Sequence, residues 1–386
     1  MTLKIGRGAL APPFLVMDVI AAANARQAAL PPGAPRIIRM EVGQPGTGAP
    51  QGALDAASAA LRGGDPMGYT EAFGRRSLRD RIVAHCHDWY GLDLPAARVA
   101  VTVGASGAFP LAFLAAFDPG DRVAMAAPFY PPYVNILTAL GIQPVILEAG
   151  LDTRFQPSVS MLDRLDPRPD GLIVASPCNP AGTMLHPDEL AAIARWCDAN
   201  GVRLISDEIY HGLNYDSPVA SAASFSPNAI VINSFSKYFS MTGWRIGWMV
   251  LPEDLIRPVE CLAQNMFISA PHISQIAAEA AFDCGVELKA NIARYRRSRD
   301  HLLTALPAAG FDRLSPAEGA FYLFADIAER SNDSVAFCAR MLAEAGVAAT
   351  PGVDFDRTRG NRFVRFSYCG PEADMADAAR RLGGWR

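Results

Sequence analysis

The chain has 386 residues, half of them hydrophobic, which suits a large core and a second, smaller unit. Its formal net charge is −4 and its sequence pI is about 5.9, without a basic block, so neither nucleic acid nor a membrane surface is expected as its main partner. The seven cysteines are dispersed and none stands in a Cys-x-x-Cys spacing. Reduced thiols and a cytoplasmic location are therefore predicted.

The first 40 residues contain paired prolines at Pro12-Pro13 and Pro31-Pro32 around a short apolar run. These prolines and Asp18 argue against a signal peptide. We expect this segment to join a smaller domain or to contact a partner subunit.

Between residues 40 and 280, short apolar runs alternate with helical patterns. Such alternation predicts crossover units on a mostly parallel sheet, so the expected fold class is α/β, with the sheet between helices. The predicted strands are Val99–Val103, Arg122–Ala126, Pro144–Glu148, Gly171–Ala175, Arg203–Ser206, Ala229–Asn233 and Gly247–Val250. Glycines and prolines interrupt the two long uncharged stretches, 99–117 and 123–147, which are therefore predicted to lie in the core and not in a membrane.

The pattern changes after about residue 285, where a smaller α+β domain is expected. Its predicted elements are a charged helix over Leu288–Leu306, a strand at Phe321–Phe324, a helix near Ser334–Ala345 and a strand at Phe363–Ser367. The expected division is thus an N-terminal segment (1–40), a large domain (41–285) and a small C-terminal domain (286–386).

One stretch, Asn233–Arg245, places a single lysine among hydroxyl side chains, with an arginine eight residues after it. A neutral Lys237 amine could condense with an aldehyde, while Ser234 and Arg245 could bind a phosphate of the same cofactor. Such a short motif is weak evidence by itself. Other polar motifs follow other predicted strands, and ligands of open parallel sheets bind at the carboxyl ends of strands.

Five motifs occur together in one order and span nearly the whole chain. They are Gly104–Ala108, Ser176–Gly182, Asp207–Tyr210, Asn233–Arg245 and Val364–Tyr368. In this order they resemble the class I and II aminotransferases, the aspartate-aminotransferase-like branch of the fold type I enzymes that use pyridoxal 5'-phosphate. The resemblance implies a large domain with a mostly parallel seven-stranded sheet, a smaller α+β domain, and a homodimer with active sites at the subunit interface.

The resemblance also implies the roles of single residues toward the cofactor. Lys237 would form the Schiff base and then carry the proton at the substrate Cα, and Asp207 would pair with the pyridine nitrogen. Tyr210 and Asn179 would bind the phenolic oxygen. The other expected cofactor contacts are Gly104, Ala105, Ser106, Tyr130, Ser234, Ser236, Arg245 and, across the dimer interface, Tyr69. Without the resemblance, purely structural roles stay open for these residues, such as a helix N-cap for Asp207 or a turn position for Asn179.

Substrate contacts are predicted from three positions. Arg365 would bind the α-carboxylate, because a guanidinium group matches a carboxylate with two parallel hydrogen bonds, and Arg362 is its nearby competitor. The backbone of Gly43 and the side chain of Asn179 are expected beside the same carboxylate. No metal site is predicted, since the dispersed histidines form no metal-type cluster.

The predicted activity is ping-pong transfer of the amino group of an L-amino acid to a 2-oxo acid. Ser106 stands where one aspartate-specific subgroup has a lysine, so aspartate is not favoured as the donor. The expected pocket neighbours Phe14, Tyr130, Phe267 and Ile268 are apolar, which favours a neutral or aromatic amino acid. An aspartate aminotransferase and a carbon–sulfur lyase or other elimination enzyme on the same fold stay open as alternatives.

Overall fold

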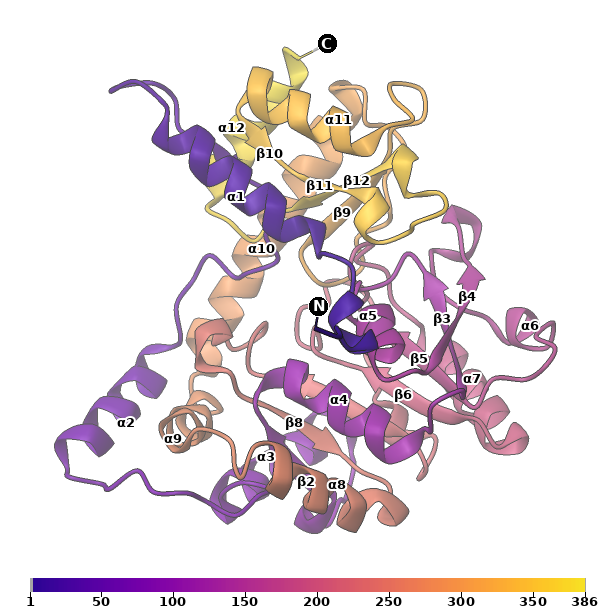
Figure 1. The fold of residues 1–386 in the computed structure, drawn as a ribbon. Helices are drawn as coiled ribbons and strands as arrows, with labels where there is room; N and C mark the ends of the chain where they lie inside the picture. Colours follow the sequence, from indigo (N-terminus) through magenta and orange to yellow (C-terminus); the bar gives the residue numbers. More distant parts are fainter. Residues whose placement is uncertain (1–2, 386) are drawn as a thin grey trace.

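The structure is a computed structural model that describes residues 3–385. A seven-stranded sheet forms the framework of the larger part of the molecule (Figure 1). The strand order is β2-β8-β7-β6-β5-β3-β4, and every neighbouring pair is parallel except the two pairs made by β8. The strands are β2 (Val99–Thr102), β3 (Arg122–Ala127), β4 (Gln143–Glu148), β5 (Gly171–Ala175), β6 (Arg203–Asp207), β7 (Ile230–Ser234) and β8 (Gly247–Val250). The predicted mostly parallel sheet is confirmed, and each predicted strand bound agrees to within one residue.

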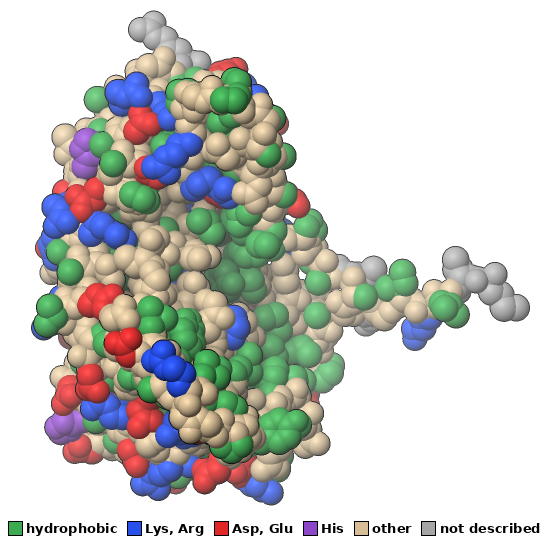
Figure 2. All heavy atoms as spheres, turned by 90° about the vertical axis from the view of Figure 1, so that its left-hand side faces the viewer, with side chains coloured by type: hydrophobic (Ala, Val, Ile, Leu, Met, Phe, Trp, Pro, Cys, Tyr) green, Lys and Arg blue, Asp and Glu red, His purple; other side chains and the backbone are tan. Residues whose placement is uncertain are grey.

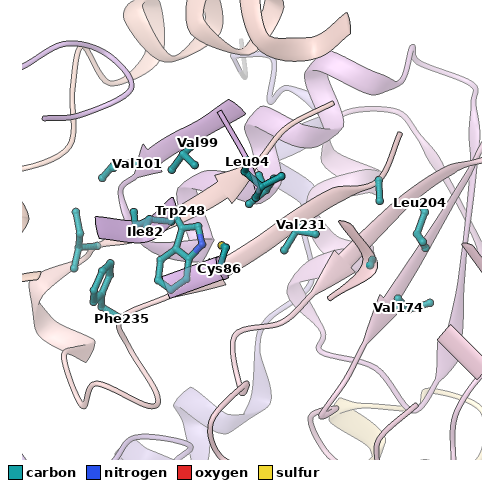
Figure 3. Close-up of a cluster of buried hydrophobic side chains, with 14 of the residues drawn as sticks. Ile82, Cys86, Leu94, Val99, Val101, Val174, Leu204, Val231, Phe235 and Trp248 are labelled. Atoms are coloured by element: carbon teal, nitrogen blue, oxygen red, sulfur yellow. The ribbon is translucent and has the colours of Figure 1, made fainter. Parts of the chain in front are cut away.

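Helices cover both faces of this sheet, because successive strand residues point to opposite faces and both sets are apolar. In β5, Leu172 and Val174 belong to one core cluster and Ile173 to the other. The first cluster packs against α3 (Arg76–Tyr90), α7 (Pro187–Asn200) and α9 (His272–Ala281), and the second against α4 (Gly104–Ala116), α5 (Pro132–Ala139) and α8 (Glu253–Met266). Figure 3 shows part of the first cluster, in which Trp248 lies near Ile82, Cys86 and Phe235. Burying one such large side chain contributes about 1.5–3 kcal/mol.

A second, antiparallel sheet lies in the upper part of Figure 1. It has the order β11-β12-β9, with β9 (Tyr322–Asp326), β11 (Thr350–Pro351) and β12 (Phe363–Ser367). The helices that accompany it in sequence are α10 (Gly285–Ala308), α11 (Ser334–Arg340), which continues as a π-helical turn over Met341–Ala345, and α12 (Glu372–Gly383). Four of these elements, α10, α11 with its π-helical turn, β9 and β12, match the predicted ones, and β9 ends two residues later than expected. The structure adds β11 and α12, which were not predicted.

The N-terminal segment packs against this second sheet. Helix α1 (Leu15–Ala28) contacts β11, and β1 (Ile38–Arg39) pairs in parallel with β10 (Val347–Ala348). The Asp354 carboxylate caps α1 by accepting hydrogen bonds from the backbone N–H groups of Leu15 (3.0 Å) and Val16 (3.1 Å). The division of the chain at residues 40 and 285 stays a prediction.

The remaining elements are short or lie at the periphery. Helices α2 (Gln51–Arg62) and α6 (Val159–Leu162) pack against α9 and α7. Short 3₁₀ turns are found at Arg7–Leu10, Ala96–Arg98, Leu151–Thr153, Ala222–Ser224, Thr242–Trp244, Gly352–Asp354 and Gly360–Arg362. Within residues 3–385, no helix combines the length and apolar character needed to cross a membrane.

Candidate active site

The predicted site residues converge on one edge of the large sheet. Asp207 ends β6, Ser234 ends β7, and Asn179 follows β5. Because β8 runs antiparallel to its neighbours, Arg245, just before its first residue, lies at the same edge. This is the edge at which open parallel sheets bind ligands.

A cavity of about 720 Å³ opens at this edge. Twelve of the fourteen predicted residues line it: Gly43, Ala105, Ser106, Tyr130, Asn179, Asp207, Tyr210, Ser234, Ser236, Lys237, Arg245 and Arg365. Gly104 lies directly beside the Arg245 guanidinium but not in the wall. Tyr69 is 83% exposed and lies outside the cavity, on the segment between α2 and α3.

Lys237 presents its amine inside this cavity. Its Nζ donates a hydrogen bond to the Gly43 carbonyl oxygen (2.6 Å) and lies 5.6 Å from the centre of the Tyr210 ring. Burial lowers the pKa of Lys237 from its usual value to about 8. At that pKa about a tenth of the amine is neutral at pH 7 and about half at pH 8, and the neutral form is the nucleophile toward an aldehyde.

Asp207 is a buried carboxyl group whose two oxygens are held separately. Its Oδ1 accepts a hydrogen bond from the Ile209 backbone N–H (3.2 Å), and the Tyr133 hydroxyl donates to Oδ2. Burial raises the pKa of Asp207 to about 6, while the two hydrogen bonds oppose that rise. The carboxylate is thus ionised at neutral pH and suited to a cationic partner inside the cavity.

A cradle for an anion lies at the start of α4. The first backbone N–H groups of a helix are free and favour a phosphate, and Ser106 there accepts a hydrogen bond from Arg245 Nη2 (3.3 Å). Arg245 Nη1 donates to the Thr242 carbonyl oxygen (2.8 Å), which fixes the guanidinium. Ser234 Oγ donates to Ser236 Oγ (2.9 Å) in the same wall.

Gly104 is required for this arrangement, and its replacement gives a test. Gly104 has φ of +65°, and an added Cβ would lie 2.4 Å from Arg245 Nη2. We expect Gly104→Ala to weaken, about 10-fold, the binding of the phosphate-bearing cofactor that the sequence resemblance implies, measured by equilibrium titration.

The matched control is Gly201→Ala. Gly201 has nearly the same φ of +66° but nothing within 4 Å of the added Cβ, so it carries the same backbone strain away from the site. Equal affinities in the two variants would show that the Gly104–Arg245 contact is unimportant for the cofactor.

Arg365 brings a guanidinium group from the second sheet to the cavity wall. It is 2% exposed and is held between the rings of Tyr322 and Phe355, at 4.5 and 4.7 Å from their centres. Its Nη1 donates to Asn179 Oδ1 (2.7 Å), whereas its buried Nε has no hydrogen-bond partner among the described residues. A buried guanidinium N–H group without a partner, beside a cavity, is suited to donate a hydrogen bond to a ligand carboxylate.

Arg362, the competitor of Arg365 in the sequence, is placed differently. Its Nη2 pairs with Asp326 Oδ2 at 2.7 Å, and it does not line the cavity. Of these two arginines, Arg365 is therefore the one that presents its guanidinium group to the cavity.

The structure adds wall residues that the sequence did not single out. Tyr322 from β9 lies with its hydroxyl 2.8 Å from that of Tyr210, and an added Cβ at Gly43 would lie 1.9 Å from the Tyr322 hydroxyl. Helix α1 contributes Val16, Met17 and Ile20. No local pattern marks these residues, because they reach the cavity only through the packing of distant segments.

For two of the four apolar residues that were expected beside the pocket, the prediction is wrong for this cavity. Phe267 and Ile268 do not line it, because they follow the end of α8, and Ile268 is 49% exposed. Phe14 and Tyr130 do line it, with ring centres 5.8 Å apart.

The mostly parallel seven-stranded sheet, with a lysine, a carboxylate and an anion cradle at its carboxyl edge, defines an α/β enzyme of fold type I. The sequence model of the family "aminotransferase class I and II" matches residues 35–382, so the chain belongs to this family. It is therefore a pyridoxal-phosphate-dependent aminotransferase, which transfers the amino group of an amino acid to a 2-oxo acid.

Known proteins resemble this chain over its whole length. A valine–pyruvate aminotransferase of Mycobacterium tuberculosis is 49% identical over 100% of this chain and 99% of its own length. The crystal structure of an aminotransferase from Mycobacterium tuberculosis superimposes with a TM-score of 0.96 at 49% identity, over 100% of this chain and 99% of that one. An aspartate aminotransferase from Thermus thermophilus, solved with maleate, has a TM-score of 0.91 at 30% identity, over 99% and 100% of the two chains.

Proposed function

We propose that the enzyme takes its amino group from a neutral, apolar or aromatic L-amino acid and passes it to a 2-oxo acid by a ping-pong mechanism. The observation that carries this proposal is the composition of the cavity wall. Its cationic side chains are Lys237, Arg245 and Arg365, and each has a role that leaves it unavailable to a charged substrate side chain. The large apolar side chains of the wall include those of Phe14, Val16, Met17, Ile20, Phe109 and Ile209.

The residues present fit pyridoxal phosphate. The α4 cradle with Arg245 suits the phosphate, Asp207 suits the ring nitrogen, and Asn179 and Tyr210 suit the phenolic oxygen. The close approach of Arg245 to Gly104 leaves no room for a larger residue there, as expected of a preformed anion site. When bound, this cofactor supplies an electron sink for the charge that develops at the substrate Cα.

The side chains then have separable tasks. Lys237 would hold the cofactor and, once released by the substrate amine, move a proton to or from the substrate Cα. The Asp207 carboxylate would keep the ring nitrogen protonated, and Arg365 would orient the substrate through its carboxylate.

A substrate with an acidic side chain meets an energetic obstacle in this cavity. Burying a carboxylate without a cationic partner costs several kcal/mol, and the wall offers none beyond the three already assigned. The name of the mycobacterial relative, valine–pyruvate aminotransferase, supports a neutral donor.

We also propose a homodimer located in the cytoplasm. Tyr69 is exposed, together with Leu54 and Leu61 of α2, and hydrophobic side chains gather in the hollowed middle of the face in Figure 2. A partner subunit covering this region would bury these side chains and bring Tyr69 toward the partner's site. All seven cysteines are free thiols, which supports a reducing compartment.

A donor panel tests the substrate class. With pyruvate or 2-oxoglutarate as acceptor, we expect valine, leucine and phenylalanine to exceed aspartate in kcat/KM by about 100-fold or more, because an aspartate side chain would be buried unpaired. The measurement is the initial rate of 2-oxo acid formation for each donor.

Two outcomes would contradict the proposal. The highest kcat/KM for aspartate would favour the aspartate aminotransferase alternative. Ammonia or pyruvate released from a single amino acid without an added 2-oxo acid would favour a lyase or elimination enzyme.

A further inference from the structure

Cys369 lies directly behind the segment that receives the Lys237 amine. It comes two residues after the end of β12 and is 3% exposed. Its Sγ donates to the Gln44 carbonyl oxygen (2.9 Å) and lies 3.5 Å from the Val42 carbonyl oxygen. Ser367 Oγ is a further neighbour of the sulfur, at 3.1 Å.

The two carbonyl groups that face Cys369 flank the one that faces Lys237. Residues 42–44 belong to no strand, and bends lie at Glu41 and Gln44, so the contacts themselves define the directions of these carbonyl groups. With Val42 and Gln44 turned toward the sulfur, the Gly43 carbonyl turns the other way, where it accepts the hydrogen bond from Lys237 Nζ at 2.6 Å.

Backbone contacts fix this segment at both ends but not at its middle. Ser367 N–H donates to the Met40 carbonyl oxygen (2.7 Å), and Gly46 N–H donates to the Cys369 carbonyl oxygen (3.0 Å). Between these two hydrogen bonds, the Cys369 thiol, just after the end of β12, contacts the carbonyl groups of Val42 and Gln44, on either side of Gly43. Tyr322 limits the opposite movement, because its hydroxyl lies against Gly43.

We propose that Cys369 is a positioning residue, whose thiol donates to the Gln44 carbonyl oxygen and lies against that of Val42, so that the Gly43 carbonyl receives the Lys237 amine. The proposal rests on the proposed role of Lys237 as the lysine that binds the cofactor. It assigns the thiol a function in catalysis although the sulfur touches neither cofactor nor substrate.

If the proposal is correct, Cys369 influences the pKa of Lys237 through the position of the Gly43 carbonyl. The charged and titratable groups around this amine are Cys369, Arg365, Asp207 and Arg245, with the Tyr210 ring beside it. Burial lowers the pKa of Lys237, and a well-placed acceptor opposes that effect by favouring the protonated amine. Loss of the thiol should let the Gly43 carbonyl move and should lower the pKa of Lys237 further.

The test follows Lys237 in the full-length apoenzyme by acetylation at a series of pH values, with peptide mapping by mass spectrometry. Lys4 and Lys289, the other two lysines of the chain, are exposed and serve as internal references. We expect Cys369→Ala to move the half-maximal acetylation of Lys237 to lower pH by about 0.5 or more. We also expect kcat to fall about 3- to 10-fold with little change in KM, as for the loss of one weak hydrogen bond.

Cys338→Ala is the matched control, because Cys338 is equally buried in α11, far along the chain from residues 42–44. It should leave the Lys237 titration unchanged, and Cys369→Ser, which keeps a donor, should restore most of the wild-type behaviour. If Cys369→Ala does not fold, Cys369→Val removes the donor while filling the space of the thiol with methyl groups.

An unchanged Lys237 titration in a folded Cys369 variant without a donor would overturn the proposal and leave the thiol a packing role. Failure of the proposed function is separately visible, since wild-type protein would then not attach pyridoxal phosphate to Lys237.

Discussion

Lys237→Ala is expected to lower kcat by about 10²–10⁴-fold, the range for loss of a positioned general acid or base. Among the described residues of the cavity wall, Lys237 carries the one amine, and none of the others could replace it as both nucleophile and proton carrier. The measurement is the steady-state rate with the best donor of the panel, at saturating pyridoxal phosphate.

Lys289→Ala is the control for this variant, because Lys289 is exposed on α10. It should retain wild-type activity. The Lys237 variant should still bind pyridoxal phosphate non-covalently through the α4 cradle, so an intact binding isotherm with lost turnover is the predicted combination. Turnover near the wild-type rate would contradict the role of Lys237.

Asp207→Asn is expected to lower kcat by about 10²–10³-fold, as for removal of a preorganised electrostatic partner. Asparagine fills the same space but carries no negative charge, so it cannot hold a proton on the ring nitrogen of the cofactor. The matched control is Glu208→Gln, since Glu208 is the adjacent buried carboxyl group and does not line the cavity.

The Asp207→Asn variant also isolates the contribution of the Asp207 carboxyl group to the pH dependence of cofactor binding. Because the pKa of Asp207 is raised to about 6, its carboxyl group becomes neutral as the pH falls through that value, and the apoenzyme should bind the cofactor less tightly. The cofactor phosphate titrates in the same range, so the Asn variant supplies the baseline. Identical pH dependence of the dissociation constant in both proteins would contradict this account of Asp207.

The sequence was sufficient for the elements whose pattern is local. Apart from the partly exposed edge strand β4, the strands of the large sheet are short apolar runs that are largely buried on both faces, and β5 and β8 have the predicted bounds without change. Once the strands were placed, the convergence of Asp207, Ser234 and Asn179 followed from the rule that parallel strands end at one edge.

Contacts in the site between residues far apart in the sequence could not be predicted, because they depend on tertiary packing. Tyr133 belongs to none of the five sequence motifs, and its hydrogen bond to Asp207 depends on how α5 docks on the sheet. Tyr322 reaches Tyr210 from a separate sheet. The wall formed by α1 had no signal either, because that helix is held by Asp354, more than 300 residues later.

Reductive trapping of the cofactor tests the central claim most directly. The protein would be incubated with pyridoxal phosphate, reduced with borohydride and digested, and the modified peptide would be identified by mass spectrometry. With only three lysines in the chain, the assignment is unambiguous. We predict modification of Lys237, prevented when a donor amino acid is added first and converts the cofactor to its amine form. Modification confined to Lys4 or Lys289, or none at all, would contradict the proposed site.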